Sequence, residues 1–100
     1  DDGYIMARNN LGVLLQKSGR LNESRAVFES ALDIDYNNSL VLLNYANVLS
    51  EIGANGDAEA SYRRVIGIDP GYKEAYRNFA QFLYNNGRYA EAKDMMEKAG

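Results

Sequence analysis

The chain has 100 residues, of which 46% are hydrophobic and 25% charged, the composition of a folded domain and not of a disordered chain. Its net charge is −3 and its lysines and arginines are scattered, which argues against a nucleic-acid interface because such an interface needs a clustered basic face. The chain contains no cysteine and no histidine, so disulfides, thiol catalysis and the commonest general base and zinc ligand are excluded.

The first four residues, Asp1 to Tyr4, match Asp69 to Tyr72 later in the chain. We therefore predict that residues 1–4 are a linker or the tail of a preceding repeat; the alternative is a natural start that matches by chance. No apolar run exceeds Leu40–Leu43, far short of the roughly 18 residues that a membrane helix needs, so no membrane insertion is expected.

The next segment predicts two helices joined by a tight turn. Apolar residues recur at helical spacing from Ile5 onward, including Leu11, Leu14 and Leu15. Gly19 can end this helix because glycine tolerates the left-handed conformation of a helix C-terminus. Asn22 is a candidate N-cap for the following helix, which reaches Ile34.

The same order of elements follows twice more. The second pair of helices turns at Gly53 and the third at Gly87. In the second pair, Asn55-Gly56 favours a turn, so we expect that corner to be looser than the others. Asp69-Pro70 ends the second pair, since proline cannot continue a helix.

These pairs are copies of one unit, because the stretch from Ser39 to Tyr72 recurs at a period of 34 residues without a gap. The shared columns are Asn10, Asn44, Asn78; Gly12, Ala46, Ala80; Leu15, Leu49, Leu83; Gly19, Gly53, Gly87; Ser24, Ala58, Ala92; and Phe28, Tyr62, Met96. We expect the small residues of the two helices in a pair to face each other, and the large residues, Met96 included, to fill the core.

A 34-residue period with these columns resembles the tetratricopeptide repeat, a helix–turn–helix unit. The resemblance implies an all-α fold, a right-handed α-solenoid of three repeats over residues 5–38, 39–72 and 73–100. The last repeat has no capping helix after it in this sequence. We therefore expect Phe82 and Met95 to be exposed there and to offer a surface for another copy of the chain.

The resemblance also implies a concave groove that is lined by the first helix of each repeat and takes a peptide or partner segment. The residues predicted to bind are Asn10, Asn44, Asn78, Asn9, Val13, Leu43, Asn47, Arg77 and Gln81. Asn10, Asn44 and Asn78 resemble the asparagine ladder of the O-linked N-acetylglucosamine transferase repeats, whose amides hold a peptide main chain. The alternative is that this column bonds between helices and is structural.

Some members of the family hold the C-terminal carboxylate of heat-shock proteins with a clamp of lysine, asparagine and arginine. The matching positions here are Asn9, Val13, Asn44, Glu74 and Asn78. Only Asn44 agrees, and Glu74 would repel an anion, so the carboxylate clamp is absent.

The sequence predicts no enzyme, because no nucleophile has a histidine base and no glycine-rich phosphate loop is present. The predicted function is a non-catalytic protein–protein interaction module, without metal or cofactor, within a larger protein. The alternatives are a structural spacer or self-assembly scaffold, and the substrate-recruiting arm of a larger enzyme. The absence of cysteine fits the reducing cytosol.

Overall fold

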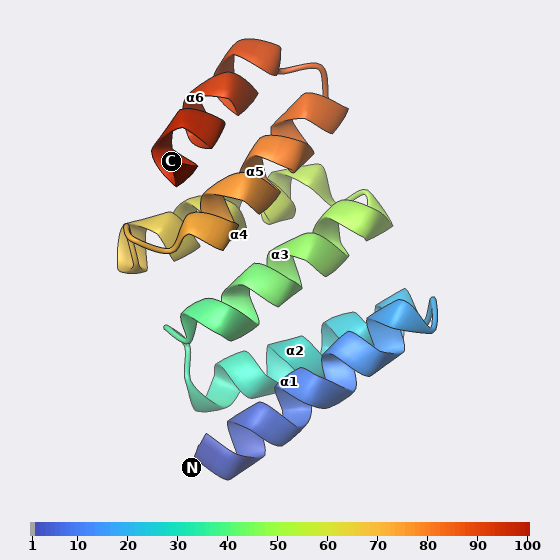
Figure 1. Ribbon diagram of the computed structural model, residues 1–100. Helices are drawn as coiled ribbons and strands as arrows, with labels where there is room; N and C mark the ends of the chain where they lie inside the picture. Colours follow the sequence, from blue (N-terminus) through green and yellow to red (C-terminus); the bar gives the residue numbers. More distant parts are fainter. Residues whose placement is uncertain (1) are drawn as a thin grey trace.

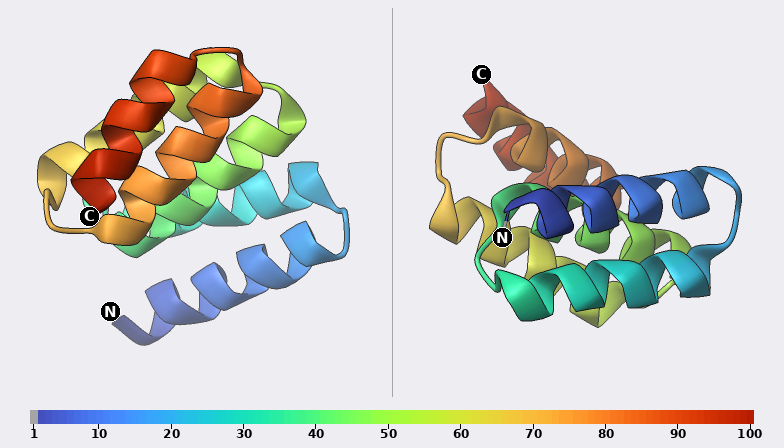
Figure 2. Two further views of the ribbon diagram at one scale, coloured as in Figure 1. Left: turned by 45° about the horizontal axis from the view of Figure 1, so that its top comes forward. Right: turned by 90° about the horizontal axis from the view of Figure 1, so that it is seen from below.

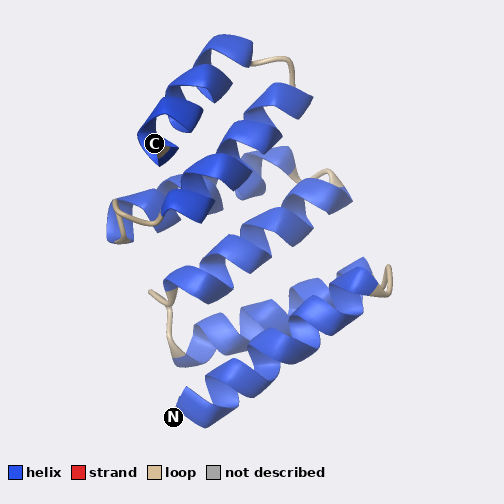
Figure 3. Ribbon diagram, in the orientation of Figure 1, coloured by secondary structure: helices blue, strands red, loops and turns tan. Residues whose placement is uncertain are grey.

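The computed structural model describes residues 2–100, and over this range the chain is helical with short connections and no strand (Figures 1 and 3). The helices are α1 (Asp2–Lys17), α2 (Leu21–Ile34), α3 (Ser39–Ile52), α4 (Asn55–Ile68), α5 (Lys73–Asn85) and α6 (Tyr89–Ala99). Helices α2, α4 and α6 begin at residues 21, 55 and 89, each 34 residues after the one before. The period in the sequence is therefore the period of the fold.

Helix α1 begins at Asp2, so residues 2–4 of the predicted linker or repeat tail are helical. Their counterparts, Pro70 to Tyr72, lie in the connection between α4 and α5. Pro70 disfavours helical geometry in Asp69, and α4 ends before it, at Ile68.

The helices form three antiparallel hairpins, α1–α2, α3–α4 and α5–α6, stacked in chain order (Figures 1 and 2). Helix α2 packs against α3 and α4 against α5, while α1 contacts α3 and α3 contacts α5. The result is a solenoid of 38 × 26 × 19 Å in which the first helices of the hairpins run side by side.

Small residues set the distance between the helices of each hairpin, as the columns predict. In the first hairpin the Ser24 hydroxyl, fully buried, donates a 2.6 Å hydrogen bond to the carbonyl oxygen of Gly12. A Cβ atom on Gly12 would lie 2.6 Å from the ring of Phe28, which is also fully buried. Only glycine therefore fits here, and the alanines in the equivalent columns are buried in the other hairpins.

Each hairpin turns in the same way, at a glycine with positive φ: 79° at Gly19, 92° at Gly53 and 77° at Gly87. The amide of the residue after each glycine donates to the carbonyl of the leucine four residues before the glycine, at 2.9 Å in all three hairpins. This is the Schellman pattern, which favours glycine because its left-handed backbone is strained for residues with a side chain.

Two local predictions are wrong. Asn22 does not cap α2, which begins at Leu21 without a side-chain cap. Asn55 and Gly56 belong to α4 and form no loose turn, because the Gly53 turn has already reversed the chain. The asparagine that does cap a helix is Asn38, whose side chain accepts a 3.1 Å hydrogen bond from the amide of Val41.

Met96, which was predicted to fill the core, is 51% exposed. Leu11 and Leu14, two of the apolar residues that recur at helical spacing in the first helix, are also exposed, at 46% and 62%. Leu11 and Leu14 lie on α1 and Met96 on α6, the first and last helices of the stack. The equivalent side chains of the inner helices are covered by the adjacent hairpin, whereas among the described residues no hairpin lies over Leu11, Leu14 and Met96.

Candidate functional site

The first helices of the three hairpins border a hollow of about 250 Å³ on one face of the solenoid. It is lined by Gln16 from α1, Asn47, Ser50 and Glu51 from α3, Tyr62 from α4, and Asn78, Gln81, Phe82 and Asn85 from α5. Most of these side chains are uncharged and polar. We call this hollow the concave groove.

The asparagine column does not form three equivalent amides. Asn10 is exposed, while Asn44 is half-buried and its Nδ2 donates a 2.9 Å hydrogen bond to Oδ1 of Asn9. Asn78 is half-buried and lines the groove. Within the described residues the side chains of Asn10 and Asn78 make no hydrogen bond, so their amides are available, whereas that of Asn44 joins α3 to α1.

Two residues predicted to contact a ligand are enclosed by the protein. Asn9 is 4% exposed and bonds Asn44 between α1 and α3, and Leu43 is 2% exposed within the hydrophobic core. Val13 is half-buried and packs against the core. Asn9 and Leu43 are therefore too buried to contact a ligand in the groove.

Asn47 remains in the groove but already has a partner. Its Oδ1 accepts a 2.5 Å hydrogen bond from the Tyr62 hydroxyl. Burial raises the pKa of Tyr62, and the nearby Glu51 carboxylate raises that pKa further, so the phenol stays protonated and remains a donor. The amide nitrogen of Asn47 is left for another acceptor.

Tyr62 and Phe82 line the groove although the sequence did not predict them there. Tyr62 was predicted to fill the core and Phe82 to be exposed on the last hairpin; both are buried, so only a small part of each reaches the groove. Gln16, Ser50, Glu51 and Asn85 line the groove from the first helices of the hairpins. Gln16 contacts Glu51 across the gap between α1 and α3.

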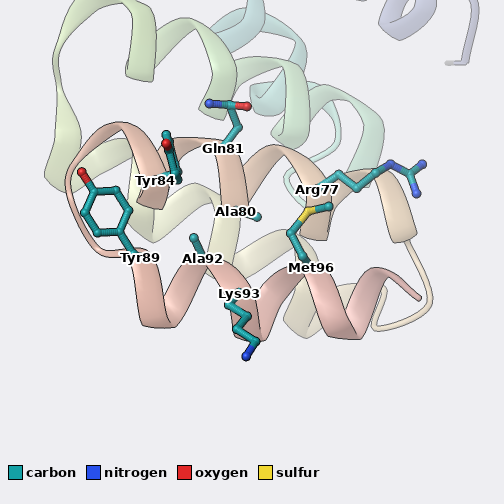
Figure 4. A pocket seen from close by; sticks show the side chains of 8 residues that line it. All are labelled: Arg77, Ala80, Gln81, Tyr84, Tyr89, Ala92, Lys93 and Met96. Atoms are coloured by element: carbon teal, nitrogen blue, oxygen red, sulfur yellow. The ribbon is translucent and has the colours of Figure 1, made fainter.

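A second, larger hollow of about 620 Å³ lies between α5 and α6 (Figure 4). It is lined by Arg77, Ala80, Gln81, Tyr84, Tyr89, Ala92, Lys93 and Met96. Tyr84 and Tyr89 form one end, in edge contact with ring centroids 5.0 Å apart, and Arg77 and Met96 form the other. Two of the predicted groove residues, Arg77 and Gln81, line this hollow, and Gln81 lines both.

The exposed apolar surface of the last hairpin is not the predicted one. Phe82 and Met95 are 3% and 8% exposed, because both point into the stack. Tyr84, Tyr89 and Met96 are more than half exposed in their place. The prediction of an exposed apolar surface on this hairpin was right about the hairpin but wrong about the residues.

Among the residues that line the concave groove, Glu51 is the one with a charged side chain. No group of acidic side chains suited to a metal ion occurs among the described residues. In the same part of the chain, no helix is long and apolar enough to cross a membrane.

Comparison with solved structures finds this arrangement in several proteins. The second repeat domain of Spaghetti (RPAP3) bound to an HSP90 peptide is 21% identical, with a TM-score of 0.86 over 96% of this chain and 89% of that one. The translocator chaperone SycD of Yersinia enterocolitica is 20% identical, with a TM-score of 0.92 over 99% of this chain and 74% of that one.

An O-GlcNAc transferase of Thermobaculum terrenum is 25% identical, with a TM-score of 0.91 over 99% of this chain, which spans only 19% of that protein. A comparison with curated protein sequences gave no match. Sequence profiles of the tetratricopeptide repeat match residues 5–35 and residues 53–100.

The profile matches cover the first hairpin and most of the other two, and the hairpins repeat every 34 residues with the small residues and turn glycines in register. The chain therefore belongs to the tetratricopeptide repeat family.

Proposed function

We propose that the chain is a non-catalytic protein-interaction module that holds a largely uncharged peptide in the concave groove. The observation that carries this proposal is the polar lining of the groove, in which side-chain amides predominate. An amide both donates and accepts hydrogen bonds, as a peptide unit does, so a row of amides suits an extended main chain.

Glu51 is the one charged side chain among the polar residues that line the groove, so the lining favours a peptide without a strong net charge. Glu74 is exposed at a position where members that hold a terminal carboxylate have a cation. The second repeat domain of Spaghetti, which shares this architecture, is bound to an HSP90 peptide, and this supports peptide binding here. Because this chain lacks the clamp residues, the proposed ligand lies along the groove and is not anchored by a C-terminal carboxylate.

The amides with the strongest claim to ligand contact are that of Asn78 and the free amide nitrogen of Asn47, both in the groove lining, while Asn10 is exposed on α1 outside this lining. Asn44 belongs to the structural contact with Asn9. The proposed ladder is therefore discontinuous, with ligand contacts toward α5 and an internal hydrogen bond between α1 and α3.

Selection of peptides from a displayed library of mixed sequence, followed by titration of the best binder, tests the proposal. Asn78→Ala should weaken binding by about 2- to 13-fold, the effect of one hydrogen bond of about 0.5–1.5 kcal/mol, without changing stability. Asn22→Ala, which removes an exposed asparagine on α2, is the matched control and should bind as the original chain does.

Asn44→Ala should behave in the opposite way. It leaves the amide of Asn9, 4% exposed, without its partner, which costs about 1–3 kcal/mol of unfolding free energy. Failure of the library to yield any binder, or unchanged affinity in the Asn78 variant, would contradict peptide binding through these amides.

A further inference from the structure

Glu51 brings a single negative charge into the concave groove. It lies near the end of α3, and among the described residues no lysine or arginine pairs with it. The side-chain amide of Gln16 on α1 donates a hydrogen bond to Oε1 of Glu51. The other carboxylate oxygen, Oε2, accepts no hydrogen bond within the described part of the chain. One oxygen is thus held by the protein and the other is left for a ligand.

The floor of the groove beside this carboxylate is aromatic. Tyr62 and Phe82 form it, with ring centroids 5.5 Å apart, and a small part of each ring reaches the groove. Burial, followed by the charge of Glu51, raises the pKa of Tyr62, so the carboxylate acts on this floor. An apolar floor next to a carboxylate suits a side chain with an apolar stem and a cationic head.

Gln81 on α5 offers an acceptor from the opposite wall of the groove. Its Nε2 donates a 2.8 Å hydrogen bond to Oδ1 of Asn85, one turn further along the same helix. This bond uses the amide nitrogen and leaves the amide oxygen of Gln81 without a partner among the described residues. Acceptors therefore come from both walls, the Glu51 carboxylate on α3 and the Gln81 amide on α5.

We propose that this part of the groove holds one arginine side chain of the bound peptide, with Glu51 as its counter-ion. The proposal rests on the proposed function and adds to it the side chain that the groove selects. A guanidinium has several N–H donors spread in one plane and no acceptor, so it can reach acceptors on both walls. The amide nitrogens of Asn47 and Asn78 remain for carbonyl groups of the peptide main chain.

The displayed library that tests the proposed function gives the first test of this inference. Peptides that bind the original chain should be enriched in a single arginine relative to the unselected library, and peptides that bind Glu51→Gln should not be. Binders without this enrichment would overturn the arginine site and leave peptide binding intact. A library that yields no binder would overturn both.

The strongest binder, synthesised with arginine or citrulline at the enriched position, measures the effect of the charge, because citrulline is a neutral analogue of similar shape. The original chain should bind the arginine form about 2- to 5-fold more tightly, the range for an ion pair open to solvent. Glu51→Gln should bind the two forms equally. Glutamine can still accept the hydrogen bond from Gln16, and circular dichroism verifies that the variant is folded.

A lysine form of the same peptide tests the choice of guanidinium. It should bind the original chain less tightly than the arginine form, because an ammonium is a compact charge that cannot span acceptors on two walls. Equal binding of the two forms would show that the site accepts any cation, and would contradict the assignment to arginine.

Glu74→Gln is the matched control for Glu51→Gln. Glu74 is exposed in the first turn of α5 and lies outside the groove lining, and its replacement removes the same charge from the chain. This variant should keep the preference for arginine over citrulline. Loss of the preference here would mean that the net charge of the chain, and not Glu51, attracts the peptide.

Glu51→Lys should reverse the selection, so that a glutamate form of the peptide binds more tightly than the arginine form. Added salt should weaken binding of the arginine form to the original chain more than binding of the citrulline form, because salt screens the ion pair. A preference for arginine that persists in Glu51→Gln or Glu51→Lys would overturn the proposal.

Discussion

Gly12 and Gly67 both lie within helices, but their surroundings differ. A Cβ atom at position 12 would meet the Phe28 ring at 2.6 Å, whereas one at position 67 would have nothing within 4 Å. The same amino acid thus permits close packing at the first position and only lowers helix stability at the second.

Replacing each glycine by leucine should separate the two effects. Gly12→Leu should lower the unfolding free energy by about 1–3 kcal/mol, because the buried Phe28 ring has no room to move aside. Gly67→Leu should raise it by up to about 1 kcal/mol through better helix propensity. Urea denaturation of the two variants measures both values, and equal changes would refute the packing role of Gly12.

At the level of single residues, the sequence predicted packing inside a hairpin better than burial between hairpins. The predicted contact between the small residues of the two helices in a hairpin involves residues only 12 positions apart, and the hydrogen bond from Ser24 to Gly12 confirms it in the first hairpin. The exposure of Leu11, Leu14 and Met96 depends on whether another hairpin covers them, which the columns do not encode. For Asn44 the structure agrees with the alternative prediction, a bond between helices, and its partner Asn9 could not be predicted because it lies in a neighbouring column of a different repeat.

At the level of elements, charged side chains link one hairpin to the next. Glu59 on α4 bonds Arg88, the residue just before α6, and also Arg63 one turn further along α4. The guanidinium of Arg88, followed by that of Arg63, lowers the pKa of Glu59 from 4.5 to about 2. The glycine turn before α6 places Arg88 within reach of α4.

This lowered pKa predicts a dependence of stability on pH. A carboxylate with a lower pKa in the folded state stabilises the fold above its unfolded pKa, and the effect disappears as the pH falls through the folded pKa. The Glu59 contribution should therefore be complete above about pH 4.5 and decline toward pH 2.

Urea denaturation at several pH values, on the original chain and on Glu59→Gln, measures this contribution. The difference between the two chains should be largest near neutral pH and shrink as the pH falls from 4.5 toward 2. A difference that stays constant across this window would show that the ionised form of Glu59 does not stabilise the fold.

The turns show why element boundaries were partly predictable. Gly19, Gly53 and Gly87 all adopt positive φ and end their helices where the sequence indicated. Asn55 and Gly56 are favourable turn residues, but the chain has already reversed at Gly53, so they enter α4. Turn propensity was overridden there by the position of the earlier glycine.

In the whole molecule the helices have unequal support. Helix α3 packs against α1, α2, α4 and α5, whereas α6, within the described residues, packs against α5 alone. Helix α3 also holds the largest group of fully or almost fully buried residues: Val41, Leu42, Leu43, Ala46, Val48 and Leu49. In a stacked array each unit is stabilised by its neighbours, so the middle hairpin should be the most stable part.

Amide hydrogen exchange followed by mass spectrometry should therefore be slowest in α3 and fastest in α6. The measurement is made on dilute protein, so that contacts between copies add no protection. Local opening of the last hairpin requires the loss of one interface, while opening of the middle hairpin requires the loss of two.

Gly12→Leu should speed exchange in α1 and α2 more than in α6, because nearest-neighbour coupling weakens with distance along the stack. Equal exchange in all helices would mean that the three hairpins open as one cooperative unit, and would contradict this account of the solenoid.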